Sequence, residues 1–511
     1  MARSIRVCFC FLLVTACVPW AAPAQMAKTA EQRTVRYLET VRQQPSLLLA
    51  FLRAMPKGGD LHNHLAGAIY AESLLDYAAA DGLCVDRTTS QLLPGPCERC
   101  EKYTNKPAVQ CAYSDHVLYN SMIDAWSMRN WHPEEESGHD HFFATFDKFF
   151  PATNGRTGTM LAEAASRAAA DHLQYLELMH TADGMQAATL GSKVGWDDDF
   201  SQLREKLLAG GLKDIVASTR KQLDEDEARM GGVLRCGTPQ ADPGCRVTVR
   251  YLYQVLRGLP REVVFAQILL GFELARIDPR FVGLNLVMPE DWYVPMRDFR
   301  LHMRIMDHMH NRYPGVHITL HAGELAMGLV PPEGLRFHIR ESIAQGHAER
   351  IGHGVAVMFE NDSLGLLREM ARKNVLVEIN LTSNDVILGV KGMNHPLPVY
   401  QRYGVPVALA TDDQGVSRSD MTHEYVRAVQ TYGFSYPELK RMARQSLEHN
   451  FLPGKSLWVS TQPFRPVTGC AADQPDGGKL SSGCQIFLDG NEHAREQWRL
   501  EREFAGFEKK Y

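Results

Sequence analysis

The chain has 511 residues, of which 45% are hydrophobic and 23% charged, a composition typical of a globular protein and not of a disordered one. Its formal net charge of -5 gives no basic surface of the kind that nucleic acid or an anionic membrane would favour. The length suits one large domain or two to three smaller ones, and a small molecule is the expected partner.

The N-terminus has the pattern of an export signal. Arg3 and Arg6 precede the apolar run "VCFCFLLVTAC", and "APA" before Gln25 offers small residues for cleavage. Residues 1–24 are therefore predicted to be a signal peptide, and the protein to be periplasmic or secreted. An alternative is a lipoprotein signal, in which Cys17 of "VTAC" would carry a lipid anchor. The apolar run is shorter than the ~20 residues that span a bilayer, and no later segment is apolar enough to do so.

The cysteines after the signal fall into local groups, as expected in an oxidising compartment. Cys236 and Cys245 bracket one turn-rich segment, and Cys470 and Cys484 bracket another, so each pair is predicted to close its own loop. The other group is a quartet comprising Cys84, Cys97, Cys100 and Cys111. Its "CERC" could be half of a zinc knuckle, but we favour two disulfides, with the pairing left open.

The main domain is predicted to begin near Pro56, after helical spacing over residues 25–55. From there, short β-rich runs alternate with longer helical ones. Eight strands are predicted, over residues 59–64, 173–180, 247–255, 281–287, 316–323, 350–354, 375–382 and 405–413. This alternation indicates an α/β fold with a parallel sheet, and eight units favour a closed (β/α)8 TIM barrel over residues 56–455. An open doubly wound sheet is the alternative, although its Gly-rich fingerprint is missing after the first strand.

Two regions interrupt the alternation. Residues 82–160 hold the cysteine quartet and the aromatic "HDHFFATFDKFFP", and are predicted to be an insertion over the barrel mouth. Whether the aromatic segment forms a substrate lid or only packs is left open. Residues 456–511 follow the eighth strand, contain a charged final helix, and are predicted to be a C-terminal extension.

Polar residues gather at the carboxyl ends of the predicted strands, where barrel enzymes build their active sites. The first strand ends in His62 and His64, whose i, i+2 spacing puts both side chains on one side of the strand. The fifth strand ends in "HAGE", the sixth in "IGHG", the seventh in "LTSND" and the eighth in "ATDDQG". Each motif alone is weak evidence, because isolated histidines and Asp-rich turns are common. Together, at one face, they predict a site.

Three histidines and a carboxylate suit zinc, which takes imidazole nitrogen and carboxylate oxygen and keeps a position open for water in catalytic sites. The ion would lower the pKa of its water toward ~7. Glu324 and His353 remain as groups that could manage protons. The glutamate could protonate a ring nitrogen while the histidine orients or deprotonates the water, which predicts hydrolytic attack at an sp2 carbon.

The motifs "MPKGGDLHNHLAGA", "HAGE", "RIGHGV", "LTSN" and "ATDDQGV", in this order and spacing, resemble the adenosine deaminase family of the amidohydrolase superfamily over roughly residues 55–450. "MPKGG", "HFFATF" and the exported, cysteine-bearing form look most like the secreted adenosine deaminase-related growth factor branch. The resemblance implies one zinc ion per chain, bound by His62, His64, His321 and Asp412. It further implies that Glu324 protonates the purine N1, that His353 positions the water and that Asp413 hydrogen-bonds N7.

Two places depart from the family pattern, and both bear on the substrate. Where the family commonly has an acidic residue that helps to hold the ribose, "HLAG" offers Ala66. In place of a typical Asp-Leu-x-Gly, "NLVMPED" has Asn285 for the aspartate and Met288 for a glycine that meets the purine through its backbone. Met288 retains a backbone N–H, so the contact with the purine could survive. Asn285 and Met288 are both predicted to bind the substrate.

The resemblance predicts hydrolytic deamination of adenosine or deoxyadenosine to inosine and ammonia, with metal-bound hydroxide attacking purine C6. A sister amidohydrolase that acts on another aminopurine or a modified adenine is the first alternative. A noncatalytic, growth-factor-like binding protein on a barrel scaffold is an alternative of another class, disfavoured because every metal and proton-transfer position is present. The sequence leaves open whether the chain forms a homodimer.

Overall fold

The computed structural model describes residues 1, 4, 29–101 and 104–511 of the chain. The predicted signal peptide and Cys17 lie outside these residues, apart from the isolated positions 1 and 4. Among the helices that are described, none is both long and apolar enough to cross a membrane.

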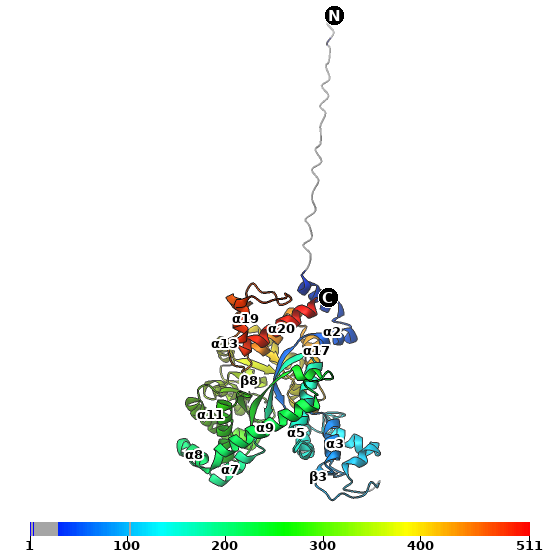
Figure 1. Ribbon diagram of the computed structural model, residues 1–511, viewed down its shortest axis with the longest axis vertical. Coiled ribbons are helices and arrows are strands. Elements are labelled where there is room, and N and C mark those ends of the chain that lie inside the picture. The colour runs from blue at the N-terminus through cyan, green and yellow to red at the C-terminus, as the bar shows by residue number, and fades with distance from the viewer. Residues whose placement is uncertain (2–3, 5–28, 102–103) are drawn as a thin grey trace.

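Eight parallel strands form the centre of the molecule and follow one another around it in chain order (Figure 1). They are β1 (Gly58–His64), β4 (Leu173–His180), β5 (Thr248–Leu256), β6 (Phe281–Val287), β7 (His317–Ala322), β8 (Arg350–His353), β9 (Leu376–Ile379) and β10 (Val407–Leu409). A parallel bridge between Asn63 and Asp412 brings the first and last strands together. The predicted (β/α)8 TIM barrel is confirmed, and the open doubly wound sheet is wrong. All eight predicted strands are present, with ends that differ by a few residues.

Helices connect the strands and cover the outside of the barrel. They are α6 (Thr157–Ala170) before β4; α7 (Gln186–Val194), α8 (Phe200–Leu207) and α9 (Lys213–Val233) after it; α10 (Arg261–Ile277) after β5; α11 (Tyr293–Arg312) after β6; α12 (His338–Ala344) after β7; α13 (Ser363–Lys373) after β8; α14 (Leu381–Leu388) and α15 (Leu397–Arg402) after β9; and α16 (Gln414–Ser417), α17 (Met421–Tyr432) and α18 (Tyr436–Glu448) after β10. In α10 every residue from Val263 to Leu274 is buried, which explains why most residues of this stretch are apolar.

The segment between β1 and β4 contains the predicted insertion. Its elements are α3 (Ala71–Ala80), β2 (Cys84–Val85), β3 (Leu92–Leu93), α4 (His116–Ala125) and α5 (Gly138–Phe149). The cysteine quartet forms two disulfides, Cys84–Cys97 and Cys100–Cys111, so the preference for disulfides over a metal site is confirmed. The insertion touches the short helix α16 after β10, where the Met128 backbone N–H donates to the Val416 carbonyl at 2.8 Å. It therefore packs at the carboxyl ends of the strands.

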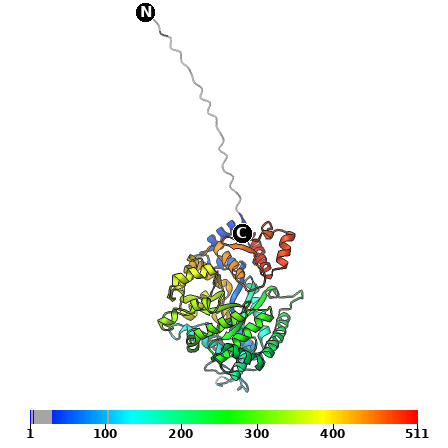
Figure 2. The same ribbon diagram turned by 90° about the vertical axis from the view of Figure 1, so that its left-hand side faces the viewer.

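The N-terminal helices and the C-terminal extension lie together at the opposite end of the barrel. The N-terminal helices α1 (Ala30–Val41) and α2 (Pro45–Ala54) lie beside the C-terminal extension, whose elements are β11 (Trp458–Thr461), β12 (Phe464–Pro466), α19 (Ser482–Asp489) and α20 (Glu492–Glu508) (Figures 1 and 2). Disulfides Cys236–Cys245 and Cys470–Cys484 close the two loops predicted for them. Four disulfides among the described residues indicate an extracellular or periplasmic protein.

Candidate active site

The closure of the barrel brings β1 and β10 together at the site. The His64 backbone N–H donates to the Asp412 carbonyl at 3.3 Å, and the Asp412 N–H donates to the His62 carbonyl at 2.8 Å. Asp412 adopts a left-handed backbone with φ 58°, three residues after the end of the short strand β10. The predicted first and last metal ligands are therefore held side by side by main-chain hydrogen bonds.

The predicted ligands converge on one point at the carboxyl ends of the strands. His62, His321, His353 and Asp412 each offer one donor atom, and these atoms all lie within 4.8 Å of one another. Nε2 of His64 lies 3.2 Å from Nε2 of His321 and 3.3 Å from Oδ1 of Asp412. The structure thus brings together the four residues that the sequence suggested as ligands, with His353 as a fifth member of the cluster.

The outer ring nitrogens of the three predicted ligand histidines face oxygen atoms. Nδ1 of His62 lies 2.7 Å from Oε2 of Glu378, and Nδ1 of His64 lies 3.0 Å from Oε1 of Gln254. Nδ1 of His321 lies 2.9 Å from Oδ1 of Asn285. The same Asn285 oxygen accepts from the His321 backbone N–H at 3.0 Å, which fixes which end of the amide is the oxygen. Each imidazole therefore donates from Nδ1 and keeps the Nε2 lone pair for the centre of the cluster.

These residues fit a bound cation. Nε2 of His62 is buried without a hydrogen-bond partner, and Oδ1 of Asp412 lies 3.5 Å from it. Ser383 donates to the other carboxylate oxygen, Oδ2 of Asp412, at 2.7 Å and so orients the carboxylate. Burial alone would raise the pKa of Asp412, but His62 and His64 outweigh it and hold the pKa well below its usual range. Three imidazole nitrogens and one carboxylate oxygen are a donor set that suits zinc.

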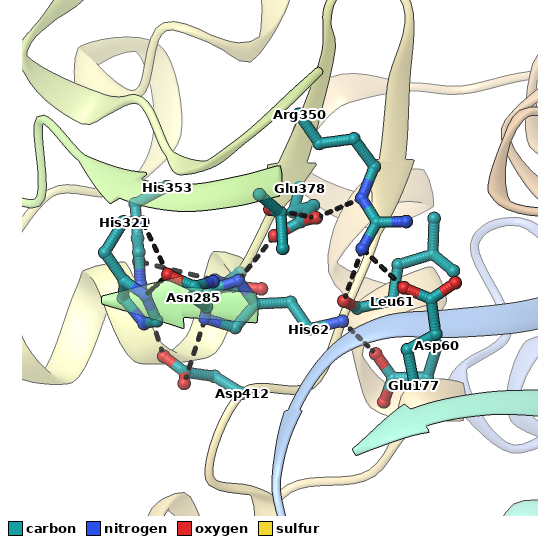
Figure 3. Close-up of polar contacts among 12 residues, drawn as sticks. Asp60, Leu61, His62, Glu177, Asn285, His321, Arg350, His353, Glu378 and Asp412 are labelled. Atoms are coloured by element: carbon teal, nitrogen blue, oxygen red, sulfur yellow. Dashed lines mark hydrogen bonds and ion pairs between the residues drawn. The ribbon is translucent and has the colours of Figure 1, made fainter. Parts of the chain in front are cut away.

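Behind His62 lies an ionic network formed by Glu177, Arg350 and Glu378, whose side chains are fully buried (Figure 3). Nε of Arg350 donates to Oε1 of Glu378 at 2.7 Å, and its Nη2 donates to Oε2 of Glu177 at 2.5 Å. Thr319 also donates to Oε1 of Glu378. The carboxylate that orients His62 is thus held by a buried cation and a hydroxyl.

Glu324, the predicted proton donor, is positioned by a second glutamate. The carboxylate of Glu290 accepts from the Gly323 backbone N–H at 3.1 Å and from the Glu324 N–H at 2.8 Å, so it fixes the turn after β7. Burial raises the pKa of Glu324 well above its usual range, and repulsion from Asp412 and Glu290 adds to this. Both effects favour the protonated form of Glu324, which is the form that a proton donor requires.

Asp413 lies beside the predicted ligand Asp412 and is also buried. Its Oδ1 has no hydrogen-bond partner, and a Cβ on Gly67 would lie only 1.6 Å from that atom. Gly67 is therefore required for Asp413 to occupy this position. Burial raises the pKa of Asp413 to about 8, with Asp412 adding repulsion, so the side chain is mainly protonated at pH 7 and can act as a hydrogen-bond donor.

Met288 has a left-handed backbone, with φ 92°, a conformation that favours glycine. Its carbonyl accepts from Nε of Arg257 at 3.1 Å, and Nη1 of the same arginine donates to the His321 carbonyl at 3.1 Å. The Met288 side chain packs over Gly258, where an added Cβ would meet its Cε at 2.8 Å. The glycine-like backbone is thus retained at Met288, and Gly258 provides room for its side chain.

Several residues of the site were missed by the sequence analysis. Glu378 orients His62, and Gln254 orients His64. Asn285, in contrast, was a candidate in the sequence, and its side-chain oxygen contacts His321. Asn285 thus stays a predicted substrate-binding residue whose described contacts are all to a ligand histidine. A signal for Glu378 was present, since it is a charged residue within the apolar strand "VLVEINLT", and such a charge must be paired when buried.

The chain resembles known proteins in both sequence and fold. The family model described as adenosine deaminase matches residues 153–457. The adenosine deaminase of Mycobacteroides abscessus is 28% identical over 299 residues, which cover 55% of this chain and 76% of that protein. The adenosine deaminase of Escherichia coli is 36% identical over 142 residues, which are 28% of this chain and only 39% of that protein. The crystal structure of Arabidopsis ADAL complexed with GMP has a TM-score of 0.50 and 19% identity, covering 79% of this chain and 94% of that one, which supports the fold alone.

Proposed function

The chain belongs to the adenosine deaminase family, as an adenosine deaminase-like hydrolase, and on this premise we propose that it is a zinc-dependent enzyme that converts adenosine or deoxyadenosine to inosine and ammonia. The observation that carries the proposal is the approach of Nε2 of His62, His64 and His321 to one another and to Oδ1 of Asp412. The Nδ1 atom of each of these three histidines faces an oxygen atom.

His62, His64, His321 and Asp412 would hold the zinc ion. When bound, the ion supplies a Lewis acid that activates water at neutral pH. Glu324 is buried, and its raised pKa favours the protonated form, so it would give its proton to the purine N1. Asp413, also buried, would donate a hydrogen bond to N7, and the Met288 backbone N–H would contact the purine. His353 would hold the attacking water beside Asp412.

A sister activity on another aminopurine is favoured by one specific observation. The residue after Leu65 is Ala66, so a carboxylate that would hold the ribose is missing from the end of β1. Met288 also places a side chain where the family has a glycine. Both changes concern recognition of the substrate and leave the proposed metal ligands unaltered.

A substrate screen separates these functions. Zinc-loaded protein is mixed at neutral pH with adenosine, deoxyadenosine, adenine or N6-methyladenine, and the released ammonia is measured. Turnover of adenosine supports the proposal, and turnover of adenine or methylated adenine alone supports the sister activity. Full zinc occupancy without ammonia from any aminopurine would contradict both and support a noncatalytic binding protein.

The variant Glu324→Gln tests the proton-transfer role within the same assay. We expect zinc content to stay near the wild-type value while turnover falls by at least about 100-fold, because general acid catalysis contributes about 10²–10⁴. Glu333→Gln, at an exposed position nine residues farther along the chain, is the matched control and should keep wild-type turnover. Survival of activity in Glu324→Gln would show that another group supplies the proton.

The remaining organisation of the chain is proposed on the sequence alone. Residues 1–24 would be removed on export, residues 56–455 would form the catalytic barrel, and residues 456–511 its extension. Lipid attachment at Cys17 and a homodimer are alternatives that mass spectrometry and light scattering of the purified protein would decide.

A further inference from the structure

His353 differs from the three proposed ligand histidines in what its outer ring nitrogen contacts. It ends β8 and is buried, with 1% of its surface exposed. Its Nδ1 lies 2.9 Å from Nδ2 of Asn384 and 3.3 Å from Nδ2 of Asn380. The Glu324 carboxyl is farther away, at 3.7 Å. An amide nitrogen donates a hydrogen bond and never accepts one. With the Asn384 amide nitrogen facing His353, Nδ1 of His353 is therefore the acceptor.

The orientation of the Asn384 amide is fixed by a second histidine. Asn384 is fully buried on α14, and its Oδ1 lies 2.9 Å from Nε2 of His395. If His395 donates from Nε2, the atom that it meets must be the amide oxygen. The amide nitrogen is then the atom that faces His353.

His395 in turn is fixed by the main chain. Its Nδ1 lies 3.1 Å from the backbone N–H of Leu397, a group that can only donate. Burial lowers the pKa of His395 to about 4, with the Arg427 charge adding to this, so the ring is neutral at pH 7. A neutral imidazole with an accepting Nδ1 carries its proton on Nε2. The direction of the whole amide chain, which runs from Leu397 through His395 and Asn384 to His353, follows from this one backbone N–H.

We propose that Asn384 and His395 are positioning residues that hold His353 as the neutral tautomer with its proton on Nε2. This atom lies 3.7 Å from Oδ2 of Asp412, at the centre of the cluster. In this tautomer Nε2 has no lone pair for a metal ion, although His353 lies within the ligand cluster. It also cannot take a proton from water through Nε2, so His353 acts as a hydrogen-bond donor to the attacking water and not as a general base.

The expected effect of the His353 tautomer on turnover rests on the proposed function, whereas the tautomer itself does not. Asn384→Asp is nearly isosteric and keeps an acceptor for His395, but it places an oxygen where the amide nitrogen faces His353. Nδ1 of His353 must then donate, and the tautomer is inverted or the ring is charged. In a serine protease triad, a wrong histidine tautomer costs about 10⁴ in turnover. We expect kcat to fall by at least about 100-fold, with KM within about twofold and zinc content unchanged.

His395 is tested by a pair of variants. His395→Leu removes the donor that orients Asn384, and we expect a smaller fall in kcat, of about 10-fold, because the amide becomes free to turn. His395→Gln offers both an acceptor for Leu397 and a donor for Asn384, and should restore most of the activity. A role in packing alone would instead be rescued by leucine and not by glutamine. Asn361→Asp, at an exposed position, is the control for adding a carboxylate.

The deciding measurement is the ¹⁵N chemical shift of the His353 ring in zinc-loaded protein, assigned by comparison with His353→Asn. We expect a protonated Nε2 and an unprotonated Nδ1 in wild type, and a protonated Nδ1 in Asn384→Asp. A protonated Nδ1 in wild type, or wild-type kcat in Asn384→Asp, would overturn the proposal. If wild type releases no ammonia from any aminopurine, the proposed function fails, yet the ring shifts still decide the tautomer.

Discussion

His62 and His353 have ring centres only 4.9 Å apart, yet opposite kinds of structure lie behind them. The outer nitrogen of His62 faces the ionic network of Glu177, Arg350 and Glu378, whereas that of His353 faces the neutral amide chain. An acceptor behind an imidazole frees Nε2 to bind a cation, and a donor behind it leaves Nε2 as a donor. Two histidines of one cluster can therefore perform different tasks because of the groups behind them.

The ionic network should contribute most to stability. Arg350→Met removes the cation shared by two buried carboxylates, and leaving a buried charge without its partner costs about 3–5 kcal/mol. Urea unfolding should show a loss of this size. Arg300→Met is the control, because Arg300 pairs with Glu341 but is 67% exposed, and its loss should cost less than about 1 kcal/mol. Equal losses in the two variants would mean that the network does not stabilise the barrel.

Replacing the carboxylate behind His62 should weaken metal binding. Glu378→Gln removes the negative charge that faces Nδ1 of His62, and loss of such an outer partner typically lowers metal affinity by about 10–100-fold. Competition with a chelator measures the change. Glu369→Gln, which alters a surface pair with Lys373, should leave zinc affinity as in wild type. Unchanged affinity in Glu378→Gln would indicate that His62 is held by other contacts.

Asn285 allows the converse change, in which a negative charge is added behind a proposed ligand histidine. Its neutral oxygen accepts from both the backbone N–H and Nδ1 of His321, and an aspartate could accept both hydrogen bonds with added charge. Asn285→Asp should therefore make Nε2 of His321 a stronger metal ligand and tighten zinc binding by up to about 10-fold in the same chelator assay. Weaker binding in this variant would show that the amide is needed for another contact.

The smallest effect is expected for an ion pair closer to solvent. Nε2 of His139 on α5 lies 2.9 Å from Oδ1 of Asp291 in the loop after β6, and thereby ties the insertion to the barrel mouth. Burial alone would lower the pKa of His139, but hydrogen bonds to Asp291 and Asp140 outweigh it and raise the pKa.

A raised pKa in the folded state means that the stabilisation is fully present below the unfolded pKa, about 6.5 for histidine, and is lost as pH rises through the folded value. The difference in Tm between wild type and His139→Asn should therefore be larger in mildly acid than in alkaline buffer, and correspond to less than about 1 kcal/mol. A difference that grows toward alkaline pH would contradict this account.

The sequence was sufficient for the features that depend on local pattern. The alternation of apolar runs and helices predicts all eight strands, and the polar residues that end β1, β7, β8 and β10 converge as expected in a barrel. Contacts between segments that are distant in the sequence could not be predicted in this way. His139 and Asp291 are 152 residues apart, and His62 and Glu378 are 316 apart, so only the folded chain shows that they meet.

The sequence also could not predict which cysteines pair or in which direction a hydrogen bond runs. Four cysteines between residues 84 and 111 allow three pairings, and spacing does not choose among them. The direction of hydrogen bonds to His353 also depends on Leu397, whose backbone N–H bears no signature in the sequence.

Anomalous diffraction from crystals grown with zinc tests the central claim most directly. The account predicts a single anomalous peak enclosed by Nε2 of His62, His64 and His321 and by Oδ1 of Asp412, with Nε2 of His353 outside the bonding distance of about 2.0–2.1 Å for a zinc–histidine contact. A peak bonded to His353, or none at this cluster in zinc-loaded protein, would contradict it.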